Sequence, residues 1–193
     1  MSTPSESPAA AGAPPSERDR FRSVYAATYP DLLRFVTRRV HPSHAEDVVA
    51  DVFLVAWRRV ADLPAELDNQ RAWLFGIARR TLLNQYRSDR RHEALAVRIA
   101  EHQPSSAGVD PELIAARLDL ARVWPSLSTA DQEAIALTAW DGLDGPAAAA
   151  VLGITPVAYR LRLSRARRSL RRLLDLPHTS AAHGAALPEG NPS

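Results

Sequence analysis

Cysteine and lysine are both absent from this chain of 193 residues. Without cysteine there is no disulfide framework, no cysteine-based zinc site and no thiol chemistry, and a reducing cytoplasm is the compartment that we expect. No run of about 18 apolar residues occurs, so no membrane span is predicted. The opening residues, MSTPSESPAAAGAPPSE, lack a basic start followed by an apolar core, and we therefore expect no secretory signal.

All 24 basic residues are arginine, and they nearly balance the 22 acidic residues, so that the formal net charge is only +2. The distribution of charge is therefore more informative than its total. Arginine suits contacts with phosphate and base edges because its planar guanidinium group donates two hydrogen bonds at once. There is no glycine-rich phosphate loop and no nucleophile motif, and His41 and His44 have no evident further ligand. We expect no catalytic residue, no cofactor and no metal.

Helical periodicity runs through the chain, and no period-two alternation bounded by hairpin turns competes with it. We expect an all-α protein made of two small helical domains joined by a flexible linker. The predicted limits are a disordered tail over 1–15, a first domain over 16–91, a linker over 92–109, a second domain over 110–176 and a disordered tail over 177–193.

The opening helix of the first domain contains a proline. We expect Pro30 to kink or divide this helix, because proline has no backbone N–H to donate. The part from Asp31 to Val40 would turn its leucine, phenylalanine and valine side chains inward. Its outward side chains would be Arg34, Arg38 and Arg39.

The next helix is predicted to begin with a capping box at Ser43 and Glu46 and to run to about Val60. One side of it is apolar and would be buried, comprising Val49, Val52, Phe53, Ala56, Trp57 and Val60. The opposite side mixes acids with aliphatic residues, namely Asp47, Asp51, Leu54, Val55 and Arg58. Such a patch favours docking onto a basic protein surface over binding to DNA. The alternative is that another helix covers Leu54 and Val55.

After a polar loop from Ala61 to Gln70, a longer helix is expected from Arg71 to about Arg91. Aromatic rings are interleaved with arginine and amide side chains along it, at Trp73, Arg79, Arg80, Asn84, Tyr86, Arg87, Arg90 and Arg91. Rings can stack on unpaired bases while cations hold phosphate, so this pattern indicates a platform for single-stranded nucleic acid. Trp73 and Tyr86 could equally belong to the core.

The second domain ends in a helix-turn-helix pattern. Asp110 and Ser128 are expected to cap the two preceding helices. A short alanine-rich helix then ends at Gly153, Thr155 caps the next helix, and Pro156 occupies its first position. This last helix carries Arg160, Arg162, Arg165, Arg167, Arg168, Arg171 and Arg172 with no acid among them. So many guanidinium groups repel one another, and nucleic-acid phosphate is the partner that we infer. The alternative is a merely solvated basic face.

These parts occur in the order found in a known family. YPDLLRFVTRR, AEDVVADVFLVAWRRV and RAWLFGIARRTLLNQYRSDRR resemble the helices of sigma region 2. Leu127-Ser128, the turn Leu152-Gly153-Ile154-Thr155 and LSRARRSLRRLL resemble region 4. From about Phe21 to Leu174, the chain is therefore similar to an extracytoplasmic-function (ECF) sigma factor, a bacterial transcription initiation factor of the sigma-70 family.

The resemblance implies a non-enzymatic protein that brings core RNA polymerase to promoters and promotes their melting. The β′ clamp of the polymerase would be bound by Asp47, Asp51, Leu54 and Arg58. The −10 element would be held by Trp73, Arg79, Arg80, Asn84, Arg87 and Arg90. The −35 element would be contacted by Pro156, Ala158, Tyr159, Arg160 and Arg162, with Arg165 and Arg168 on phosphate or on the polymerase β flap. An anti-sigma factor is an expected partner, and the free protein is expected to be a monomer.

The chain departs from the family pattern in the second domain. Alanine stands at Ala147, where the family usually has glutamate, and the run from Ala158 to Arg162 replaces one similar to Thr-Val-Lys-Ser-Arg. Both a divergent and a weak −35 preference therefore stay open. The alternative function is a helix-turn-helix regulator that binds duplex DNA as a dimer without polymerase, but it leaves the first domain unexplained. The placement of the arginines disfavours a pure protein-interaction module.

Overall fold

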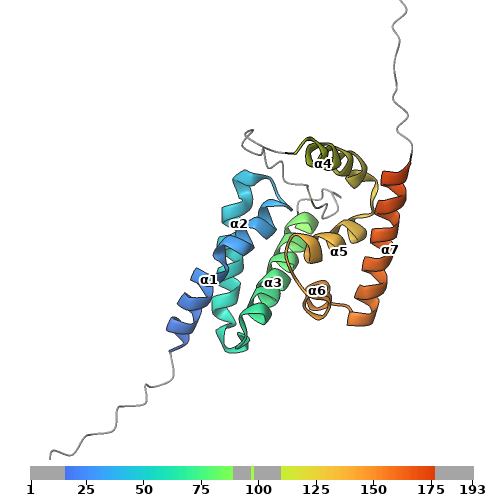
Figure 1. Cartoon of the computed structure of the whole chain (residues 1–193). Coiled ribbons are helices and arrows are strands. Elements are labelled where there is room, and N and C mark those ends of the chain that lie inside the picture. The colour runs from blue at the N-terminus through green and yellow to red at the C-terminus, as the bar shows by residue number, and fades with distance from the viewer. Residues whose placement is uncertain (1–15, 89–96, 98–109, 177–193) are drawn as a thin grey trace, which may run out of the picture.

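The computed structural model describes residues 16–88, 97 and 110–176, and all regular structure within these ranges is helical, as predicted. The first bundle comprises α1 (Glu17–Thr37), α2 (Pro42–Arg58) and α3 (Leu67–Ser88), with a 3-10 helix over Val60–Asp62. The second bundle comprises α4 (Pro111–Val123), α5 (Thr129–Ala139), α6 (Gly145–Leu152) and α7 (Pro156–Asp175), with a 3-10 helix over Trp124–Ser126. Figure 1 shows the two bundles side by side, with α3 next to α5 and α6.

The predicted domain limits stay predictions. Both predicted tails and, apart from Val97, the predicted linker lie outside the described residues. Among the helices that are described, none is long and apolar enough to cross a membrane.

The start of α1 agrees with its sequence, but its continuation does not. Ser16 caps the helix, since its side chain accepts a hydrogen bond from the Asp19 backbone N–H. The division at Pro30 is wrong, because α1 runs without interruption to Thr37. A proline inside a helix removes one backbone hydrogen bond. The turns that follow bury Leu32, Phe35 and Val36, and this burial offsets the loss.

The predicted starts of α2 and α3 are also displaced. His41 caps α2 in place of the capping box, its Nδ1 accepting from the Ser43 backbone N–H at 3.4 Å. Pro42 occupies the first helical position, where the fixed φ of proline suits the helix and no N–H is needed. α3 begins at Leu67, so the last part of the loop predicted to reach Gln70 is helical.

The predicted buried side of α2 is confirmed at all but one position. Val49, Val52, Phe53, Ala56 and Val60 are buried, whereas Trp57 is 41% exposed. The Trp57 ring packs edge-on against Phe21, with 5.1 Å between ring centroids.

The second bundle begins its helices where the sequence predicts. The side chains of Asp110, Ser128 and Thr155 each accept a hydrogen bond from a backbone N–H in the first turn. Gly153 ends α6 with a φ of 68°, a left-handed conformation that glycine adopts without strain. Local turn chemistry thus produces the helix-turn-helix of α6 and α7.

A residue from the predicted linker belongs to the core of the second bundle. Val97 is buried together with Trp124, Leu127 and Ile135. Its backbone N–H donates to Oε1 of Gln132 at 3.1 Å, and its carbonyl accepts from Nε1 of Trp124 at 2.5 Å. Both main-chain polar groups of Val97 are therefore satisfied inside the bundle.

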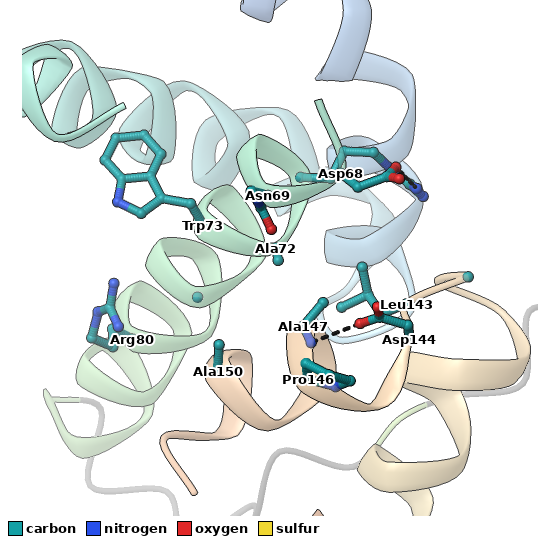
Figure 2. Close-up of a pocket in the computed structure, with 13 residues that line it drawn as sticks. Asp68, Asn69, Ala72, Trp73, Arg80, Leu143, Asp144, Pro146, Ala147 and Ala150 are labelled. Atoms are coloured by element: carbon teal, nitrogen blue, oxygen red, sulfur yellow. Dashed lines mark hydrogen bonds and ion pairs between the residues drawn. The ribbon is translucent and has the colours of Figure 1, made fainter. Parts of the chain in front are cut away.

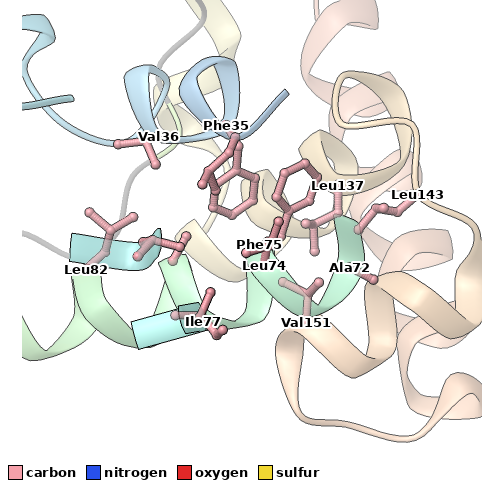
Figure 3. Packing of buried hydrophobic residues seen from close by; sticks show 14 of the residues in the cluster. Phe35, Val36, Ala72, Leu74, Phe75, Ile77, Leu82, Leu137, Leu143 and Val151 are labelled. Atoms are coloured by element: carbon pink, nitrogen blue, oxygen red, sulfur yellow. The ribbon is translucent and has the colours of Figure 1, made fainter. Parts of the chain in front are cut away.

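One hydrophobic core runs through both bundles. Leu74 and Phe75 of α3 lie close to Leu137 of α5 and Val151 of α6 (Figure 3). α6 packs against α3 on one side and α7 on the other. The short alanine side chains of α6 permit this close approach. A helix that is apolar on most sides is also stable only when other elements cover it.

Candidate polymerase and nucleic-acid interfaces

The outer face of α2 carries the four residues that the resemblance assigns to polymerase binding. Asp47, Asp51, Leu54 and Arg58 are all exposed. Their spacing of four, three and four residues places them on one side of the helix. Leu54 is 55% exposed, so no other helix of the described ranges covers it. None of the ion pairs in these ranges involves Asp47 or Asp51, which leaves both carboxylates available to a partner.

A polar and aromatic stripe runs along α3. Asn69, Trp73, Arg80 and Asn84 repeat at intervals of four, seven and four residues, which places them on one side of the helix. Gly76 lies between Trp73 and Arg80 on the same side. A Cβ there would lie 3.7 Å from the Arg80 guanidinium group, an ordinary van der Waals contact. We call these five residues the α3 stripe.

The tryptophan of the α3 stripe already carries a cation beside its ring. Trp73 is half-buried, and the guanidinium carbon of Arg59 lies 5.9 Å from its ring centroid. Arg59 follows α2 directly and is exposed. The aromatic face and the cation that a single-stranded nucleic acid needs are therefore adjacent. No local sequence pattern identifies Arg59, because its proximity to Trp73 depends on how α2 and α3 pack.

An open cavity of about 430 Å³ is lined by residues of the α3 stripe and of the helix-turn-helix. Asn69, Trp73 and Arg80 lie on the α3 side, and Pro146, Ala147 and Ala150 of α6 lie on the opposite side (Figure 2). Ala147 donates its backbone N–H to Oδ1 of Asp144 at 2.8 Å. The alanine at position 147 thus borders the cavity and adds no charge to it.

Arg79 lies outside the α3 stripe and has a partner in the second bundle. Its Nε and one terminal nitrogen donate to the two carboxylate oxygens of Glu133 at 2.6 and 3.1 Å. This bidentate geometry is the strongest that an arginine and a carboxylate form. The side chain of Arg87 and all of Arg90 lie outside the described residues.

A second group of charges joins the bundles at Asp141. Its carboxylate accepts from Arg38 and, at 3.1 Å, from Arg39. The prediction that Arg39 points outward is wrong, because the residue is only 1% exposed and its guanidinium carbon lies 3.5 Å above the centroid of the Phe35 ring. Burial lowers the pKa of the Arg39 guanidinium group, and the charge of Asp141 opposes that shift.

Most residues predicted to contact the −35 element lie exposed on α7. Pro156, Ala158, Arg160, Arg165 and Arg168 are exposed, and Arg162 is half-buried. The helix start presents small and basic side chains next to the N-terminus that Thr155 caps, which suits insertion into a DNA major groove. The remaining arginines, Arg167, Arg171 and Arg172, are exposed as well.

Tyr159 is a correction to the predicted DNA contacts. It is fully buried, and its hydroxyl donates to the Ala134 carbonyl at 2.8 Å and shares a 2.6 Å hydrogen bond with Oγ1 of Thr138. Burial raises the pKa of this hydroxyl above its usual value. Tyr159 therefore anchors α7 to α5 and is not available to DNA.

Comparison with known proteins finds a family match in each of the two bundles. Residues 24–92 match the family model described as Sigma-70 region 2, and residues 117–170 match Sigma-70, region 4. RNA polymerase sigma factor CnrH of Cupriavidus metallidurans is 37% identical over 144 residues, which are 67% of this chain and 73% of that protein. Two solved structures are also similar. The sigma factor RpoE in complex with the anti-sigma factor NepR, from Bartonella quintana, has a TM-score of 0.60 and 26% identity, covering 82% of this chain and 98% of the other. CnrH in complex with the cytosolic domain of CnrY has a TM-score of 0.54 and 33% identity, covering 83% and 90%.

Proposed function

The chain belongs to the ECF sigma factors of the sigma-70 family, and from this premise we propose which of its surfaces makes each contact during transcription initiation. It is a non-enzymatic factor for promoter recognition by RNA polymerase through regions 2 and 4. The first bundle contains region 2, and the second contains region 4.

The outer face of α2 binds the β′ clamp of core polymerase. Asp47 and Asp51 supply negative charge without a partner in the described chain, and Leu54 supplies apolar area beside them. Negative charges steer association with a basic surface. Burial of the neighbouring exposed leucine in the interface adds favourable free energy, because its apolar surface is removed from water. Arg58 adds a cation at the end of the same face.

The α3 stripe holds the unpaired strand of the −10 element, and this stripe is the observation on which the proposal chiefly depends. Trp73 offers a ring on which a base can stack, Arg80 can hold a phosphate, and Asn69 and Asn84 carry amides that both donate and accept hydrogen bonds. Arg59 lies beside the Trp73 ring as a further cation, and its Nε and one terminal nitrogen are paired with the exposed Asp62. Capture of bases that have left the duplex stabilises the melted promoter, because those bases are then no longer free to pair again.

α7 enters the major groove at the −35 element. Ala158, Arg160 and Arg162 lie in its first two turns, where helix-turn-helix proteins contact base edges. Arg165 and Arg168 lie farther along and contact phosphate or the polymerase β flap. The exposed apolar residues Val157 and Leu161 add contacts suited to thymine methyl groups.

An anti-sigma factor is the proposed inhibitory partner. RpoE and CnrH have been solved with anti-sigma factor NepR and with the cytosolic domain of CnrY, respectively. The similarity of this chain to both supports a partner of the same kind.

Run-off transcription tests the proposal. Purified protein and core polymerase are incubated with a pool of promoter fragments from a GC-rich bacterial genome. We expect transcripts that depend on the protein, and their start sites will reveal both promoter elements. Binding to duplex DNA without any protein-dependent transcript would contradict the proposal and favour a regulator that acts without polymerase.

A further inference from the structure

The outward side of α7 is apolar at its centre near the start of the helix. Val157 and Leu161 are 56% and 55% exposed. They are four residues apart, which places them about 40° apart around the helix and ~6 Å apart along it. Ala166 is fully buried and lies nine residues after Val157, about 180° around the helix from it. Both aliphatic side chains therefore point away from the second bundle, and α5 and α6 lie between α7 and the first bundle (Figure 1).

Arginine side chains surround this aliphatic pair. Arg160, Arg165 and Arg168 are exposed, and none of the ion pairs in the described ranges involves them. No acidic residue occurs on α7 before Asp175, so this side of the helix is positively charged. Such a surface matches a DNA groove, where phosphates line both edges, better than it matches an apolar protein surface.

The start of α7 lacks the side chains that read adenine and cytosine directly. Residues Pro156 to Leu163 include no carboxylate and no carboxamide, and α6 has neither. Asparagine or glutamine forms bidentate hydrogen bonds to adenine, and aspartate or glutamate accepts from the amino group of cytosine. Arg160 and Arg162 can bind guanine. Val157 and Leu161 have no polar group, so the feature of a base edge that they suit is the methyl group of thymine.

We propose that Val157 and Leu161 read the methyl group on carbon 5 of a pyrimidine, so that 5-methylcytosine can replace thymine in the −35 element. The inference rests on the proposed function of α7 and adds a form of regulation to it. Carbon 5 has the same place in the rings of cytosine and thymine, and its methylation leaves the pairing with guanine unchanged. A DNA methyltransferase transfers the methyl group from S-adenosylmethionine to carbon 5, which releases its proton. Methylation of a cytosine beneath either side chain then strengthens binding to the promoter.

The spacing of the two side chains fits neighbouring base pairs. Base pairs are stacked about 3.4 Å apart, so side chains ~6 Å apart along α7 can contact methyl groups one or two steps apart. Removing one group of this size from water contributes about 0.8 kcal/mol, which corresponds to ~4-fold in affinity. Two methyl groups contacted together should therefore strengthen binding ~15-fold.

Binding of duplex DNA by the full chain tests the inference. The chain first enriches sequences from a library of random duplexes, and one enriched duplex is then synthesised in matched forms and titrated by fluorescence anisotropy. In one series, each thymine is replaced in turn by uracil, which lacks only the methyl group and still pairs with adenine. In a second series, cytosine or 5-methylcytosine stands at the same positions opposite guanine.

We expect uracil to weaken binding ~4-fold at each contacted thymine, and 5-methylcytosine to bind ~4-fold more tightly than cytosine there. Each comparison changes one methyl group within an unchanged base pair, so the loss of a hydrogen bond cannot produce the difference. Less than twofold at every position in the uracil series overturns the inference. A response to uracil without any difference between cytosine and 5-methylcytosine overturns the proposed effect of methylation.

Truncation of each aliphatic side chain identifies the reader. Val157→Ala and Leu161→Ala should each bring the ratio of affinities for thymine and uracil close to 1 at one position and leave it unchanged at the other. Leu118→Ala is the matched control, because Leu118 is 66% exposed on α4, and it should keep every ratio. Circular dichroism checks that the variants are folded. Ratios in Val157→Ala and Leu161→Ala that equal those of the wild type overturn the inference, even where the overall affinity falls.

Arg160→Ala separately tests the −35 assignment of α7. We expect it to weaken binding of the enriched duplex at least ~5-fold, because a contact to a base edge is lost. If it does so while uracil has no effect, the −35 assignment stands and the reading of methyl groups is wrong. If no sequence is enriched, or if Arg160→Ala binds as tightly as the wild type, the assignment of α7 fails and this inference fails with it.

Discussion

Reversing the charge of Asp51 is the sharpest test of the α2 face. Asp51 is exposed, and no ion pair of the described ranges involves it. Asp51→Arg should therefore alter the free energy of unfolding by no more than about 0.5 kcal/mol, as is usual for a surface substitution. Any larger loss of function must then come from the interface with polymerase.

The expected size of that loss follows from Coulomb's law. A unit charge about 4 Å from an opposite charge is stabilised by ~1 kcal/mol in bulk water and by ~4 kcal/mol at the effective dielectric constant of a protein surface. Reversal replaces this attraction by repulsion, so the total change is about 2 kcal/mol even at the lower limit. We expect the affinity for core polymerase to fall at least ~30-fold.

The assay is a titration of dye-labelled protein with core polymerase at about 0.15 M salt, where exposed charges farther apart than ~8 Å are screened. Glu46→Arg is the matched control, because it makes the same charge change on the same helix. Glu46 lies about 140° around the helix from Asp51, at 100° per residue. We expect its affinity to change less than ~3-fold. Equal losses in both variants would refute the docking face and indicate a general effect of net charge.

Three further predictions concern the remaining surfaces. Trp73→Ala should weaken binding of single-stranded DNA by about 1–3 kcal/mol, measured by anisotropy, because a stacking ring is lost. Arg165→Ala should weaken binding to duplexes of any sequence alike and lower the salt slope by about 0.9, whereas a loss confined to one sequence would assign Arg165 to a base. Tyr159→Phe should lower the free energy of unfolding by about 1–3 kcal/mol in urea, because the Ala134 carbonyl loses its donor. The raised pKa of Tyr159 means that its neutral hydroxyl stabilises the fold below pH ~10 and that this stabilisation is lost at higher pH. The free energy of unfolding of Tyr159→Phe should therefore depend less on alkaline pH than that of the wild type. The same alkaline dependence in both proteins would contradict this.

Features that depend on a few neighbouring residues could be predicted from the sequence. The caps at Asp110, Ser128 and Thr155 and the left-handed Gly153 each depend on residues within one helical turn. The exposed face of α2 followed from spacing alone, because a helical repeat separates its apolar and acidic sides.

Contacts between the bundles could not be predicted in this way. Arg39 and Asp141 are 102 residues apart, and Arg79 and Glu133 are 54 residues apart, so no local pattern connects them. Arg39 lies beside Arg38 in a basic run that is usually exposed, and its burial is made tolerable by the approach of Asp141 together with the carbonyl and ring of Phe35. The sequence GPAAAAVL did carry a usable signal, because a helix with so few polar side chains must be covered on more than one side.

The burial of Val97 limits how far the protein can extend. While Val97 stays in the core of the second bundle, only nine residue steps join it to Ser88 at the end of α3, and these reach no farther than ~30 Å. A tether of that length keeps the two bundles at an effective local concentration in the millimolar range, so bundles that part will meet again quickly. Release of Val97 would make 22 steps available between Ser88 and Asp110, or about 75 Å. Burial of one valine side chain therefore sets the maximum distance between the two bundles. Its release from the core of the second bundle would more than double that distance.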